Sequence, residues 1–139
     1  MNRFWQTDPA LIQEMKDGGC GILSAMELSP TVYQVADANT MYAALLQVNF
    51  IEPDCTILSW DNVLNSVGPR LHYRKTVNDR IYVCAIGEAE IIKWWMRNVK
   101  EDHFTTGDGH GNCAWNSMNN PSIMSAYADF VERYIVSTV

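Results

Sequence analysis

The chain has 139 residues, which is enough for one domain with a hydrophobic core of its own. Its hydrophobic share of 47% and charged share of 19% are those of a folded protein and exclude intrinsic disorder. Ten basic side chains stand against sixteen acidic ones, giving a net charge of −6, and they are dispersed. We therefore expect no nucleic-acid partner.

No stretch of the sequence has the apolar length of a signal peptide or a membrane span. We therefore expect a cytoplasmic protein with no membrane partner. The four cysteines, Cys20, Cys55, Cys84 and Cys113, have wide and irregular spacings without a CxxC pair. This pattern favours reduced thiols over a disulfide framework.

Helices are predicted for the first half of the chain. Asp8 is a suitable N-cap, Pro9 suits the first helical position, and the glycines at 18 and 19 end this helix. Cys20 then opens a second helix, which ends near Leu28 because the Ser-Pro pair that follows disfavours helical geometry. The cysteine is thus predicted at a helix N-terminus.

Further along, cap residues at 37–40 precede a third amphipathic helix, and residues 60–67 form a brief fourth one. Residues 71–74 alternate as a strand does, and residues 80–86 have the pattern of a buried strand. Residues 88–98 are predicted to return to helix, since acids occupy the first turn and apolar residues share one face.

Two strands are predicted around a glycine-rich turn, residues 103–106 and 112–116, and residues 134–139 form the last strand. Helices followed by mainly antiparallel strands indicate an α+β fold. The single predicted domain, residues 1–139, has a helical part at 7–67 and a sheet part at 70–139.

Nucleophilic thiol chemistry requires a thiolate, a base and a group that orients the base. The helix N-terminus favours a thiolate at Cys20. Across the predicted hairpin, His103 lies near Asn116, whose amide oxygen can accept the imidazole N–H and fix the tautomer. Asp108 is the rival third member, although a solvated turn residue is its simpler interpretation. For Cys20 alone, a small buried core residue is the simpler interpretation.

The chain resembles papain-like cysteine peptidases of the C39-like, bacteriocin-processing type, and most closely small stand-alone bacterial and phage members. The residues that carry this resemblance are Gly19-Cys20-Gly21 opening a helix, His103-Phe104 at a strand start, and Trp115-Asn116-Ser117. The resemblance implies N-terminal helices packed on an antiparallel sheet, a Cys-His-Asn triad, cleavage of a peptide or isopeptide bond in a peptide or protein substrate, and no cofactor. It also implies a glutamine before the nucleophile as an oxyanion donor, here Gln13, beside the Cys20 backbone N–H.

Two alternatives remain open. Cys20, His103, His110 and Cys113 are residue types that bind zinc, but they lack the tight pairing of structural zinc sites, so no metal is expected. The second alternative is an inactive binding or inhibitory module that uses exposed tryptophans to contact its partner. Its candidate residues are Trp60, Trp94 and Trp115.

Overall fold

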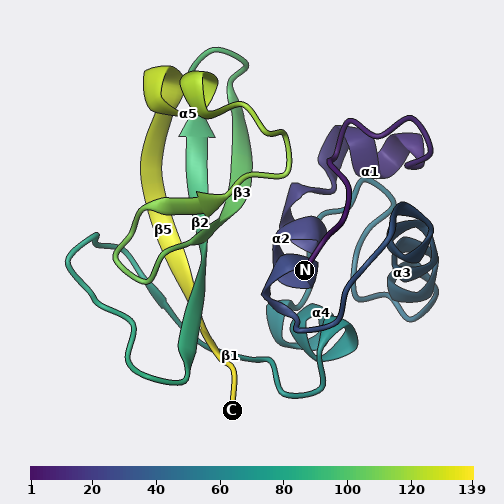
Figure 1. Cartoon of the computed structure of the whole chain (residues 1–139), viewed down its shortest axis with the longest axis horizontal. Helices are drawn as coiled ribbons and strands as arrows, with labels where there is room; N and C mark the ends of the chain where they lie inside the picture. Colours follow the sequence, from purple (N-terminus) through teal and green to yellow (C-terminus); the bar gives the residue numbers. More distant parts are fainter.

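The computed structural model describes all 139 residues and shows an α+β fold with five helices and one five-stranded antiparallel sheet (Figure 1). The helices are α1 (Gln13–Gly18), α2 (Cys20–Leu28), α3 (Val35–Gln47), α4 (Trp60–Val67) and α5 (Pro121–Tyr127). The strands are β1 (His72–Val77), β2 (Glu88–Met96), β3 (Glu101–Gly107), β4 (Cys113–Trp115) and β5 (Ala128–Ser137), and they lie in the order β1-β5-β2-β3-β4. None of the helices combines the length and apolarity needed to cross a bilayer.

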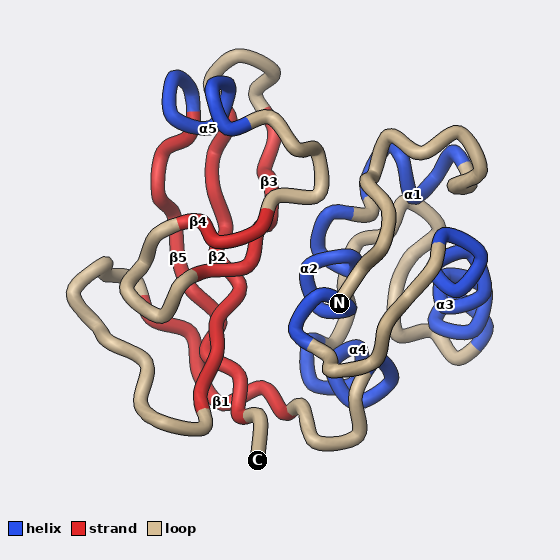
Figure 2. The backbone as a smooth tube through the Cα atoms, in the orientation of Figure 1, coloured by secondary structure: helices blue, strands red, loops and turns tan.

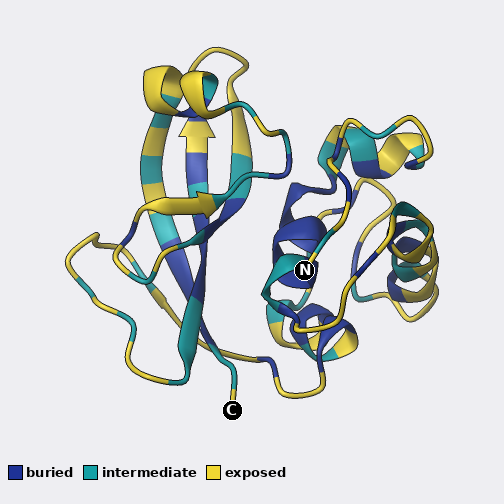
Figure 3. Ribbon diagram, in the orientation of Figure 1, coloured by how far each residue is buried: buried dark blue, intermediate teal, exposed yellow.

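Helices α1 to α4 lie together on one side of the molecule and the strands on the other, with α5 at one end of the sheet (Figure 2). The main core fills the space between these layers. Residues 20–26 of α2 are all buried, and α2 contacts β3 and β2 (Figure 3). A helix that is apolar on every side has to be enclosed. Each fully buried aliphatic side chain of α2 contributes about 2 kcal/mol to folding.

The prediction of a helix at 88–98 is wrong, because these residues form β2, the central strand. Ile91 and Ile92 are successive residues that point to opposite faces, and both are fully buried. A strand covered on both faces buries such a pair. β2 pairs with β5, about 30 residues later in the chain, on one side and with β3, the next strand, on the other, so its backbone groups are satisfied by strands on both edges.

The predicted strand at residues 80–86 is also wrong. These residues belong to the loop between β1 and β2, and they pair with no strand. Ile81, Val83 and Ile86 are exposed, and Ile86 is fully so, at 106%, while Tyr82 and Cys84 are half-buried. The apolar run indicated a buried strand, but β5 occupies the place beside β2 that this segment would have needed.

Several boundaries differ from the predicted ones. α1 begins at Gln13, because the Asp8 side chain accepts a hydrogen bond from the Ala10 N–H at 2.9 Å and holds a separate turn. β5 begins at Ala128, well before residue 134, and α5 was not predicted. The helices at 20–28 and 60–67 and the hairpin of β3 and β4 are confirmed, and four helices precede the first strand, although α5 lies between β4 and β5.

A smaller apolar cluster lies apart from the main core. It contains Ile92, Trp94 and Met96 of β2 together with Met124 of α5. α5 therefore covers this part of the sheet, which explains why a short helix interrupts the strands here. The two clusters place apolar cover on both faces of β2.

Candidate active site

The start of α2 meets β3 at a cavity of about 580 Å³ that Cys20 and His103 both line. Cys20 is the first residue of α2 and is 8% exposed, and His103 is half-buried on β3. The glycine at 21 permits this close approach. A Cβ there would lie 3.4 Å from the rings of Phe104 and Trp60. The helix N-terminus thus points its first residue at the strand that carries the histidine.

The imidazole of His103 is oriented by Asn116. Its Nε2 lies 2.7 Å from Oδ1 of Asn116, which also accepts the backbone N–H of Met118 at 3.1 Å. An N–H group can only donate, so the amide atom facing both groups has to be the oxygen. Nε2 of His103 therefore carries a proton, and Nδ1 is left to act as a base.

The amide nitrogen of Asn116 donates to Oδ1 of Asn120, which fixes its other end. Asn120 also lines the cavity. No sequence pattern singles out this residue, because nothing in its surroundings indicates a partner four positions earlier. It acts on the histidine only through Asn116.

The protonation of His103 depends on the cysteine. Burial lowers the pKa of the imidazole, but a hydrogen bond to Cys20, the charge of that sulfur and the Asn116 bond together raise the pKa above its ordinary value. Burial raises the pKa of the thiols at Cys55 and Cys84 to about 12 and about 11. No histidine acts on those two cysteines.

The structure does not bring Gln13 to the cavity. Gln13 is exposed on α1, and its amide donates to Asp17 at 2.8 Å. Gln6, which the sequence analysis did not name, lines the cavity instead. As the first residue of α2, Cys20 has a backbone N–H with no acceptor inside its own helix, which leaves it as an oxyanion donor.

Gln6 joins the two halves of the site. Its side chain is 3% exposed, and Nε2 donates to the carbonyls of Met15 at 3.1 Å and Lys16 at 3.0 Å. Its Oε1 accepts the hydroxyl of Ser117, the residue after Asn116. Gln6 therefore ties the end of α1, just before Cys20, to the segment that orients the histidine.

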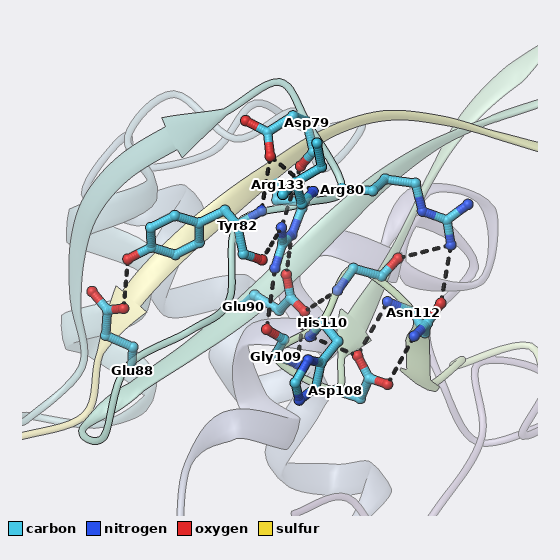
Figure 4. A network of polar contacts seen from close by, with 12 residues as sticks. Asp79, Arg80, Tyr82, Glu88, Glu90, Asp108, Gly109, His110, Asn112 and Arg133 are labelled. Carbon is cyan, nitrogen blue, oxygen red and sulfur yellow. Dashed lines mark hydrogen bonds and ion pairs between the residues drawn. The ribbon is translucent and has the colours of Figure 1, made fainter.

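Asp108 does not contact His103. Its carboxylate accepts the backbone N–H groups of His110 at 2.8 Å and Asn112 at 3.1 Å, within the turn between β3 and β4 (Figure 4). His110 is exposed there, and so is Cys113. No three His, Cys, Asp or Glu side chains converge as a metal site would require.

A buried ion pair holds the same turn in place. Arg133 of β5 and Glu90 of β2 are both fully buried and paired through Nε and Oε1. The other carboxylate oxygen accepts the N–H groups of Gly109 at 2.7 Å and Gly111 at 3.1 Å (Figure 4). Arg133 also donates to the carbonyl of Tyr82 at 2.6 Å. This network, which the sequence did not indicate, fixes the turn that leads into β4 and Asn116.

The three tryptophans named as a binding surface do not lie together on one exposed surface. Trp94 is 5% exposed in the smaller cluster. Trp60 lines the Cys20 cavity, with its ring 5.3 Å from Phe104 and 4.9 Å from Tyr134. Trp115 stacks on Trp5 instead, at 5.9 Å.

The arrangement suits attack by a thiol on a carbonyl group. A cysteine at a helix N-terminus adjoins an imidazole of fixed tautomer, in a cavity large enough for part of a peptide. The wall of Trp60, Phe104 and Tyr134 offers apolar contact to a side chain of such a ligand. No protein-family model, curated protein or solved structure matches this chain.

Proposed function

We propose that this chain is a papain-like, C39-like cysteine hydrolase that cleaves a peptide or isopeptide amide bond in a peptide or protein substrate, without a cofactor. The proposal is supported chiefly by the contacts of His103, whose ring is bonded to Asn116 at 2.7 Å and whose pKa responds to Cys20. Nucleophile, base and orienting group then lie in the order that thiol catalysis requires. We further propose that it acts in the cytoplasm.

In this mechanism His103 Nδ1 takes the proton of the Cys20 thiol, and the thiolate attacks the carbonyl carbon of the amide. The backbone N–H of Cys20 donates to the oxyanion. The C–N bond then breaks, and the leaving amine takes the proton from His103, which leaves a thioester on Cys20. Water attacks this thioester and gives its proton to His103, and the sulfur departs as the free thiolate.

The experiment that tests this proposal is alkylation of the four cysteines with iodoacetamide near neutral pH, followed by mass spectrometry. Cys20 is expected to react fastest although it is buried, and His103→Ala is expected to slow it by about tenfold or more. Cys113 is the internal control, because it is the most exposed of the four. Partial desolvation raises the pKa of the Cys113 thiol.

A second readout is the reaction with p-nitrophenyl acetate. An acyl-enzyme predicts a burst of p-nitrophenol near one equivalent per chain, absent in Cys20→Ala, with unchanged circular dichroism. Equal slow labelling of all four cysteines, with no burst, would reject the hydrolase. It would favour the alternative, a catalytically inactive binding or inhibitory module on the same fold.

A further inference from the structure

A second cavity, of about 510 Å³, does not include Cys20 among its lining residues. Asn116 lines it, and Asn120 lines both this cavity and the first. Its volume is within the range of small-molecule sites, which are mostly apolar with a few polar groups. No step of the reaction proposed for Cys20 involves this second cavity, so we consider its function separately.

The walls of this cavity are aromatic and flat. Trp5 and Trp115 stack with their planes 14° apart, and Trp94 contributes a third indole. Trp5 is 41% exposed, a large amount for so large an apolar side chain, and it stacks on Trp115 at the cavity edge. Such surfaces favour a planar aromatic ligand, which can stack or meet them edge to face.

Arg80 supplies the one cation of the lining. Its guanidinium carbon lies 5.6 Å from the Trp94 ring, and only Nη2 donates hydrogen bonds, to Gly111 and Asn112 (Figure 4). None of the six ion pairs of the molecule includes Arg80. In a chain with a net charge of −6, an unpaired guanidinium beside an apolar cavity is complementary to a carboxylate.

We propose that this cavity binds a small planar aromatic carboxylate. The ring lies against the indoles of Trp5 and Trp115, and the carboxylate accepts hydrogen bonds from the free N–H groups of Arg80. This inference does not depend on the chemistry of Cys20, because neither Arg80 nor the tryptophans contact the thiol cavity.

The test is calorimetric titration of the full chain with indole-3-acetate and with indole-3-acetamide, which has the same shape and no charge. The acid is expected to bind about tenfold more tightly than the amide, since Arg80 forms charge-assisted hydrogen bonds only with the acid. Arg80→Gln is expected to remove this preference while leaving amide binding unchanged. Arg70→Gln, at an exposed arginine outside the cavity, is the matched control and should bind as the unaltered chain does.

Because Arg80 also holds the turn through Gly111 and Asn112, thermal unfolding of each variant is recorded. Trp5→Ala, which touches no part of that turn, should weaken both ligands alike. Equal affinity of the unaltered chain for acid and amide, or no heat at millimolar ligand, would overturn the proposal. If the cavity binds the acid but Cys20 proves unreactive, only the hydrolase proposal is rejected. If Cys20 proves reactive but the cavity binds neither ligand, only the proposal for this cavity is rejected.

Discussion

Asn116 is the residue on which the orientation of the histidine depends. Its oxygen accepts from His103 and Met118, and its nitrogen donates to Asn120. Asn116→Ala is expected to lower the rate of Cys20 alkylation by about tenfold, because the imidazole loses its fixed tautomer.

Asn116→Asp is the matched variant for this prediction. A carboxylate keeps both accepted hydrogen bonds, and its charge should raise the pKa of His103 further, while the amide of Asn120 turns to donate. An NMR titration of the His103 ring measures this shift. Equal alkylation rates for the alanine and aspartate variants would show that the amide has no part in orienting the base.

The raised pKa of His103 makes the stability of the fold depend on pH. A histidine that binds its proton more tightly when folded adds stability that is complete below its unfolded pKa of about 6.5 and is lost as the pH rises through the folded pKa. The stability advantage of the unaltered chain over His103→Asn should therefore be largest in acid and decline toward alkaline pH. Urea unfolding across this range measures it.

The control for this prediction is Cys20→Ala, because Cys20 supplies the hydrogen bond and charge that raise the pKa of His103. In that variant the pKa of His103 should fall, and the dependence of the stability on pH should flatten. An unchanged pH profile in Cys20→Ala would mean that the sulfur and the ring do not interact.

At the scale of elements, the buried pair of Glu90 and Arg133 joins β2, β5 and the turn before β4. Glu90→Ala leaves a buried guanidinium without its partner and frees the N–H groups of Gly109 and Gly111. This change is expected to cost about 3–5 kcal/mol of unfolding free energy. Urea denaturation measures the loss.

The double variant Glu90→Leu with Arg133→Met distinguishes the charge from the packing. Replacing both ions by apolar side chains removes the desolvation penalty, so part of the lost stability should return. A double variant less stable than Glu90→Ala alone would mean that the hydrogen bonds to the turn, and not the unpaired charge, carry the effect.

The same strand shows why the sequence predicted some elements and missed others. The helix at Cys20 and the hairpin before Asn116 depend on glycines and turn residues within a few positions, so local patterns predicted them. Residues 88–96 have acids first and apolar residues on one helical face, yet they form a strand because β5, distant in the sequence, pairs with one edge and β3, the next strand, pairs with the other. Glu90 was interpreted as a helix-start acid for the same reason.

The residues of the candidate site also differ in whether local sequence patterns could predict their positions. His103 and Asn116 meet across a hairpin, which short-range spacing can indicate, and Cys20 follows from the helix start. Gln6 gains its contacts from the packing of α1 against the segment after β4, which no local pattern contains. Asn120 gains its contact from the course of that segment itself, since its partner Asn116 is four residues earlier. The resemblance pointed to Gln13, but the residue at the cavity is Gln6.

Considered as a whole, the molecule consists of a helical layer that holds the cysteine and a sheet that holds the histidine, with the asparagine directly after β4. Gln6 links the two layers at the cavity through Met15, Lys16 and Ser117. The relative position of the layers therefore determines whether the sulfur and the imidazole meet. A substitution that loosens this link should weaken the site without touching its reacting groups.

Gln6→Ala tests this link, with Gln13→Ala as a matched control of the same residue type on an exposed helix face. Gln6→Ala leaves buried polar groups without partners, so we expect a loss of about 1–3 kcal/mol of unfolding free energy and slower alkylation of Cys20. Gln13→Ala should change stability by less than about 0.5 kcal/mol, since exposed sites tolerate substitution. If Gln13 were the oxyanion donor that the resemblance implies, its loss would instead slow the p-nitrophenol burst by about 100-fold with the fold unchanged.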